Sequence, residues 1–138
     1  TRPMAGLAPG VHFDRIDEAI AKTAMTTANS LGAKAIAAMT ESGATAMWMS
    51  RIGTDIPIYA LSEQPRTRRR VTLYRGVNPI SFDPTQREHD AVNREAVAEL
   101  QSRDVVSGDD LVVITKGDLA GVRGGTNALK VVRVNEIL

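Results

Sequence analysis

The stretch AIAAMTESGATAM, residues 35–47, decides the fold of this chain. An apolar run at residues 35–39 ends abruptly, and a new apolar-periodic segment begins at Ala44, which predicts a buried strand, a tight turn and a helix start. Hydroxyl groups and a glycine gather where the first N–H groups of that helix lack intrahelical partners, at Thr40, Ser42, Gly43 and Thr45. Such a helix end attracts anions, because its free N–H donors and the positive end of the helix dipole point the same way. The alternative is that Thr40 or Ser42 simply caps the helix.

The composition is that of one ordinary globular domain. The chain has 138 residues, of which 43% are hydrophobic and 24% are charged, and 17 basic residues against 16 acidic ones give a net charge of +1. This balance provides no electrostatic attraction to nucleic acid or to a membrane surface. Cysteine is absent, no apolar run approaches the length of a membrane span, and residues 1–10 show no signal-peptide pattern. We therefore expect a cytoplasmic protein with neither a nucleic acid nor a membrane as partner.

Strands alternate with helices along the chain. Residues 1–13, with several Pro and Gly, are expected to be a linker or a cut end, and residues 14–138 to form one α/β domain. Periodicity predicts helices at 16–31, 43–52, 66–74 and 83–102, and strands at 35–39, 56–61, 77–82, 111–115 and 128–134. Pro79 favours an edge position for the third strand. The alternation predicts a mainly parallel sheet covered on both faces, in three α/β/α layers. The last loop is too short for a helical crossover, so the fifth strand should be antiparallel.

A glycine-rich loop, residues 116–127, is expected to face the turn at 40–45. Both segments follow strands, and ligands of such sheets bind beyond the carboxyl ends of the strands. The loop would provide phosphate contacts from Lys116, Gly121, Arg123, Gly124, Gly125 and Thr126. The alternative is a mobile hairpin. The loop lacks the G-K-[ST] ending of a P-loop, so nucleotide hydrolysis has no support.

The other polar groups have simpler interpretations. The arginines at positions 66, 68, 69 and 70 are interpreted as a solvated helix face. His12 and His89 are isolated, so no metal site is expected. No Ser/His/Asp arrangement is apparent, so no catalytic residue is predicted in this chain.

Three segments carry a resemblance to a known family. Residues 21–46, 56–80 and 107–134 resemble the carboxy-terminal domain of pyruvate kinase, and the likeness extends over about residues 14–134. Its most specific motifs are T-x-S-G from Thr40, P-x-T-x-x-x-x-x-L-Y-R-G from Pro65, and G-x-T-N from Gly124. The resemblance implies a five-stranded mixed sheet of order 3-2-1-4-5, with the last strand antiparallel.

The resemblance also implies a regulatory function. In that family this domain carries the allosteric effector site and part of the oligomer interface, while a separate barrel transfers phosphate from phosphoenolpyruvate to ADP. The partners implied are a phosphorylated effector, a second copy of the domain and the catalytic barrel. Mg²⁺ and K⁺ would belong to that barrel, so no cofactor, metal or catalytic activity is expected in this chain.

The resemblance maps the effector site onto residues 40–45 and the second effector loop onto residues 117–126. Ala44 and Asp118-Leu119 depart from the members that bind fructose 1,6-bisphosphate. That ligand, a sugar monophosphate and AMP therefore all stay open. Two other functions also stay open: a structural assembly domain with a vestigial pocket, and a stand-alone protein that binds phosphorylated metabolites.

Overall fold

A five-stranded sheet organises the domain. The computed structural model describes residues 15–84, 89–117 and 126–138. The sheet has the order β3-β2-β1-β4-β5, in which β5 is antiparallel to β4 and the other pairs are parallel. The strands are β1 (Ala35–Met39), β2 (Ile58–Ser62), β3 (Val77–Ser81), β4 (Leu111–Lys116) and β5 (Ala128–Arg133). The predicted strand order and the predicted antiparallel fifth strand are both confirmed, and β3 with its Pro79 lies at an edge.

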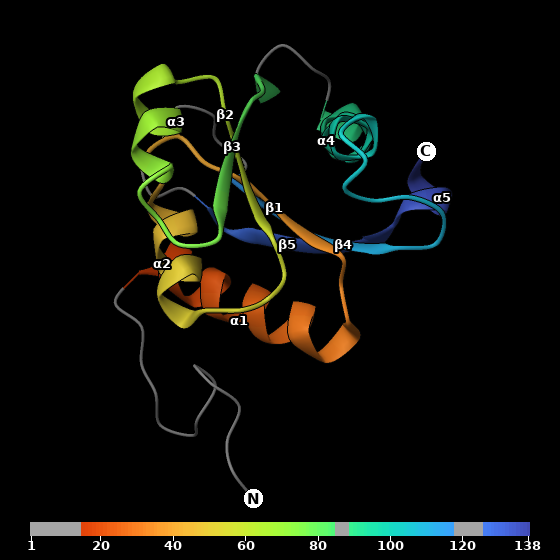
Figure 1. The fold of residues 1–138 in the computed structure, drawn as a ribbon, viewed down its shortest axis with the longest axis horizontal. Helices are drawn as coiled ribbons and strands as arrows, with labels where there is room; N and C mark the ends of the chain where they lie inside the picture. The colour runs from red at the N-terminus through yellow and green to blue at the C-terminus, as the bar shows by residue number, and fades with distance from the viewer. Residues whose placement is uncertain (1–14, 85–88, 118–125) are drawn as a thin grey trace, which may run out of the picture.

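Helices cover both faces of this sheet. They are α1 (Ile16–Leu31), α2 (Ala44–Ile52), α3 (Pro65–Val71), α4 (His89–Ser102) and α5 (Val134–Ile137). Figure 1 shows α1 and α2 on one side of the sheet and α4 on the other. The predicted three-layer architecture is therefore confirmed.

The central strand β1 separates two hydrophobic cores. All five of its side chains are buried, as expected for a parallel strand covered on both faces. Ile36 and Ala38 belong to the core beneath α1 and α2, whereas Ala37 and Met39 belong to the core beneath α4. This alternation follows from the two-residue period of a strand. Because β1 is packed on both faces, its carboxyl end holds the start of the turn at residues 40–43 in a fixed position.

Several element ends differ from the sequence-based prediction. β2 begins at Ile58, because Pro57 has no N–H group to donate to a neighbouring strand. α3 ends at Val71 rather than at residue 74, and two tighter turns continue it, in which Leu73 and Tyr74 donate backbone N–H groups to carbonyls three residues earlier. The helix predicted at 83–102 is described from residue 89 onward, and residues 85–88 lie outside the described part. Residues 1–14 lie outside it as well.

The carboxyl end of the chain contains a helix that the sequence did not predict. The strand expected at 128–134 ends at Arg133, and the short helix α5 begins at Val134. The Val134 N–H donates to the Asp110 carbonyl at 2.9 Å, and the Asn135 N–H donates to the Gly108 carbonyl at 2.9 Å. These two bonds join the start of α5 to the loop before β4, so tertiary contacts override the β-branched pattern that favours a strand.

Two kinds of feature are absent from the part of the chain that the structure describes. No helix there is long and apolar enough to cross a lipid bilayer. No group of three or more His, Cys, Asp or Glu side chains there is arranged to hold a metal ion.

Candidate anion-binding site

The turn between β1 and α2 depends on Gly43. This residue is the N-cap of α2 and has φ +86° and ψ 1°, in the left-handed region that side chains disfavour. A Cβ atom at this position would lie 3.1 Å from Cγ1 of Val71, which is fully buried. Glycine is therefore required twice, once for the backbone conformation and once for the close packing of α3 against the turn.

The hydroxyl groups of Thr40 and Ser42 both point back into the turn. Thr40 Oγ1 accepts a hydrogen bond from the Gly43 N–H at 2.9 Å, and Ser42 Oγ accepts a longer one from the Ala44 N–H at 3.3 Å. In these bonds each oxygen acts only as an acceptor, so each hydroxyl still has its own hydrogen to donate. The N-cap of α2 is Gly43, so neither Thr40 nor Ser42 is the N-cap that the sequence allowed, and both hydroxyls instead stabilise the turn before the helix.

Helix α3 fastens the same turn from the side. Thr67 Oγ1 donates to the carbonyl of Glu41, and Arg70 Nη1 donates to the carbonyl of Ser42 at 3.0 Å. Arg68 Nη1 donates to the Ser62 carbonyl, at the end of β2, at 2.9 Å. The predicted solvated face is consistent with Arg66, Arg69 and Arg70, which are exposed, while Arg68 is partly buried. Beyond that prediction, Arg68 and Arg70 also bind backbone carbonyls. The i,i+3 spacing of Thr67 and Arg70, which places them on one helix face, was the available signal.

The start of α2 is also joined to the beginning of β5. Thr45 Oγ1 donates to Thr126 Oγ1 at 2.8 Å, and both residues are buried, with exposures of 1% and 6%. Beside them, the Asn127 N–H donates to the carbonyl of Lys116, the last residue of β4. The two segments predicted to share one sheet edge therefore meet there. In this bond Thr45 joins α2 to the segment before β5. Contact between Thr45 and a ligand stays a prediction.

The remaining predicted contacts fall in the second loop. Gly121, Arg123, Gly124 and Gly125 lie outside the described residues, so their positions relative to the turn are not given.

Charges of both signs surround the turn. Arg70 brings a guanidinium group to its backbone, while Glu41, Glu63 and Asp83 follow the ends of β1, β2 and β3. Burial raises the pKa of Glu63 above its ordinary value of 4.5, and the negative charges of Asp83 and Glu41 raise it further. The local electrostatic potential around the turn is therefore mixed.

One buried polar atom near this edge has no partner among the described residues. It is Oγ1 of Thr115, whose residue is fully buried on β4 in register with Ala38, two positions before Thr40. A buried hydroxyl without a partner costs about 1–3 kcal/mol. Sequence reasoning missed this residue, because a threonine in a β-branched strand gives no separate signal.

Comparison with known proteins gives consistent matches. The family model for the pyruvate kinase alpha/beta domain matches residues 18–132. The chain is 46% identical over 123 residues to a pyruvate kinase of Buchnera aphidicola from Acyrthosiphon pisum, covering 88% of this chain and 25% of that protein. It is 42% identical over 125 residues to pyruvate kinase II of Salmonella typhimurium, covering 90% of this chain and 26% of that protein. The chain thus spans about a quarter of the length of the relatives that it matches.

Proposed function

The chain belongs to the pyruvate kinase family, in which it is the alpha/beta domain, and from this premise we propose that it regulates a pyruvate kinase by binding a phosphorylated metabolite at residues 40–45. The parent protein would transfer phosphate from phosphoenolpyruvate to ADP in its catalytic barrel, and this domain would pack against that barrel. The observation that carries the proposal is the turn at the start of α2, where hydroxyl groups, helix N–H groups and Arg70 gather at one sheet edge.

Each part of the turn suits a phosphate group. The hydroxyls of Thr40 and Ser42 have hydrogens left to donate, and the first turn of α2 presents backbone N–H groups that have no partner within the helix. The positive end of the helix dipole favours a negative charge there. Bonds from such donors to a charged oxygen are about twice as strong as neutral ones.

The carboxylates of the same edge limit the kind of ligand. Glu41 and Glu63 lie near the turn, and each would repel an additional negative charge on the ligand. A metabolite with a single phosphate, such as a sugar monophosphate or AMP, is therefore favoured over fructose 1,6-bisphosphate.

The exposed edge of the sheet supports self-association. Within the part of the chain that the structure describes, β5 pairs with β4 on one side only, and an unpaired edge strand offers its backbone groups to another strand. We propose that a second copy of the domain pairs with β5.

Thermal unfolding with added ligands tests the phosphate site. A ligand at a hundredfold excess over its Kd should stabilise the chain by roughly 2.7 kcal/mol. In a domain of this size that corresponds to an increase in Tm of about 5 °C or more. The panel is ribose 5-phosphate, glucose 6-phosphate, AMP, fructose 1,6-bisphosphate and inorganic phosphate.

Three variants locate the effect. Ser42→Asp should abolish the ligand shift, because its carboxylate would occupy the anion position, while its own stability changes little, since Asp can accept the same turn bond. Arg70→Gln should reduce the shift, whereas the matched control Arg66→Gln, exposed on the same helix, should keep it. If no phosphate compound moves the Tm of the unmodified chain, the turn only caps the helix. In that case the hydroxyls of Thr40 and Ser42 serve only their bonds within the turn, and the domain is a structural assembly domain with a vestigial pocket.

A further inference from the structure

An exposed threonine follows the run of arginines at the end of α3. Residues 68–70 are all arginine, Val71 is the last residue of the helix, and Thr72 and Leu73 come next. The three arginines therefore lie four, three and two positions before Thr72. Thr72 is exposed, and Leu73 is 83% exposed, the highest value among the large hydrophobic residues that the structure describes. The charged, hydroxyl and apolar groups of this segment thus all reach the surface.

The arginines of this segment have no carboxylate partner within the domain. None of the ion pairs among the described residues includes an arginine of residues 66–75. Arg70 donates only to a backbone carbonyl, that of Ser42, which leaves its charge uncompensated. The exposed guanidinium of Arg69 has no hydrogen-bond partner in the described part of the chain. These charges are therefore available to the carboxylates of a second protein, which bind arginine strongly and with defined geometry.

From this pattern we propose that Thr72 is a phosphorylation site for a serine/threonine kinase that selects arginine-rich substrates. Kinases distinguish their substrates partly by charge pattern. Here carboxylates of the kinase would bind Arg69 and Arg70, and an apolar pocket would take Leu73. No feature of the regulatory function proposed above is needed for this modification.

The reaction uses ATP as the second substrate. The hydroxyl oxygen of Thr72 attacks the γ-phosphorus of ATP, a new P–O bond forms while the bond to the ADP oxygen breaks, and a carboxylate of the kinase accepts the hydroxyl proton. The phosphate carries a charge of about −1.5 to −2 at pH 7. The modification would therefore offset up to two of the five positive charges that the arginines of residues 66–75 carry.

The bonds that hold Thr72 in place are few and local. Thr72 Oγ1 donates to the Arg69 carbonyl at 2.6 Å, and the Leu73 N–H donates to the Arg70 carbonyl at 3.1 Å. Both bonds span three residues, at the end of a helix of only seven residues, and such tight turns have poorer hydrogen-bond geometry than an α-helix. Helix ends open locally more often than a domain core does. The segment can therefore become extended enough to enter a kinase active site while the sheet stays folded.

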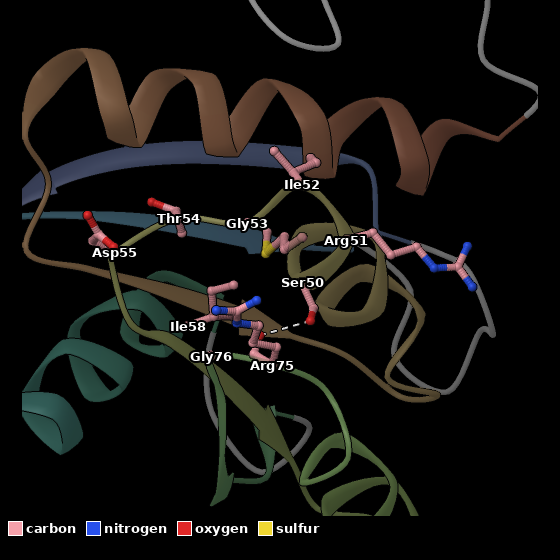
Figure 2. Close-up of a pocket in the computed structure, with 10 residues that line it drawn as sticks. Ser50, Arg51, Ile52, Gly53, Thr54, Asp55, Ile58, Arg75 and Gly76 are labelled. Carbon is pink, nitrogen blue, oxygen red and sulfur yellow. Dashed lines mark hydrogen bonds between the residues drawn. The ribbon is translucent and has the colours of Figure 1, made fainter.

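Two anchors beside Thr72 limit this opening. Val71 is fully buried, and Ser50 Oγ donates to the Arg75 carbonyl at 2.8 Å, as Figure 2 shows. Opening must remove Val71 from the core, so only a minor fraction of molecules is open at any time. We therefore expect the folded chain to be phosphorylated more slowly than an unstructured peptide of the same sequence.

The test is a kinase reaction on the folded 138-residue chain, followed by mass spectrometry of its proteolytic peptides. The probe enzyme is the catalytic subunit of cAMP-dependent protein kinase, which selects arginines two and three positions before its acceptor, with ATP and Mg²⁺. A synthetic peptide of residues 66–76 is the positive control. The folded chain should gain one phosphate, at Thr72, at a rate about tenfold or more below that of the peptide.

Three variants assign the reaction to the proposed groups. Thr72→Ala should abolish it, and Arg69→Gln should slow it by about tenfold or more, because one charged hydrogen-bonded contact with the kinase is lost. The matched control Arg66→Gln, six positions before Thr72, should react like the unmodified chain. All three side chains are exposed, so the variants should fold. The proposal is overturned if the folded chain gains no phosphate, whether or not the peptide does. It is also overturned if the phosphate lies on another residue, or if Arg69→Gln and Arg66→Gln react at equal rates.

Discussion

Replacing Gly43 with alanine adds a methyl group at the point where the turn meets α3. The backbone conformation, with φ +86°, costs a residue with a side chain about 1–2 kcal/mol. The new methyl group would also lie 3.1 Å from Val71 Cγ1, and Val71 is fully buried, so it has little room to move. Overpacking of this kind costs about 1–3 kcal/mol. Because alanine also restricts the unfolded chain, which returns about 0.4–1 kcal/mol, we expect a net loss of roughly 2–4 kcal/mol.

Gly32 provides a matched control for the backbone part of this cost. It caps α1 with φ 66° and ψ 40°, and a Cβ atom there would meet nothing within 4 Å. Gly32→Ala should therefore lose only about 1 kcal/mol. Urea denaturation of both variants separates the two contributions, since the difference between them reports the contact with Val71.

A double-mutant cycle with Val71→Ala then identifies the contact itself. If the methyl group collides with Val71, the loss in the double variant should be smaller than the sum of the two single losses, by about 1 kcal/mol or more. Equal losses for Gly43→Ala and Gly32→Ala, together with additive losses in the cycle, would refute the argument that α3 packs so closely on the turn that only glycine fits.

Two further predictions concern charge and assembly. Because the pKa of Glu63 is raised on folding, ionisation of this carboxyl opposes folding, and Glu63→Gln should increase the free energy of unfolding at pH 7. Below about pH 4 the carboxyl is protonated in both states, so the same substitution should leave the free energy of unfolding unchanged. Urea denaturation at both pH values measures the two effects, and equal effects would contradict the raised pKa of Glu63. For assembly, the chain has no cysteine, so Lys130→Cys on the exposed face of β5 should form disulfide-linked dimers under mild oxidation, whereas the control Ser81→Cys on the other edge strand, β3, should not. Equal linking by both variants, or linking by neither, would show that β5 is not the interface.

The sheet could be predicted from the sequence because its signals are local. Each strand is a short apolar run and each crossover is a helix-periodic segment, which predicts a parallel sheet, and the short last connection predicts an antiparallel fifth strand. The strand order 3-2-1-4-5 came from the resemblance to the pyruvate kinase domain. The glycine after β1 was likewise a local signal, since an S-G pair between a strand and a helix is typical of a turn. The meeting of Thr45 with Thr126 agrees with the expectation that the two segments share one sheet edge.

The remaining features depend on contacts between distant segments. Arg70 and Thr67 bind carbonyls 28 and 26 positions away in the chain. Their i,i+3 spacing places them on one helix face, but it does not show which distant segment that face contacts. The helix at Val134 depends on carbonyls of the loop before β4. The pocket drawn in Figure 2 combines the end of α2 with the turn before β3, and these two segments come together only when the sheet is assembled.

The position of β1 in the sheet has a consequence for how the domain forms on the ribosome. β1 pairs with β2 on one side and with β4 on the other. Ala35 of β1 is in register with Val112 of β4, so this second pairing cannot form until residue 112 has been synthesised. Until then, the growing chain has only β1, β2 and β3, and one whole edge of its most apolar strand is without a partner. Such an edge is a site for aggregation. We therefore expect truncated chains that end before residue 111 to depend on chaperones, and folding to become cooperative only when β4 and β5 have emerged.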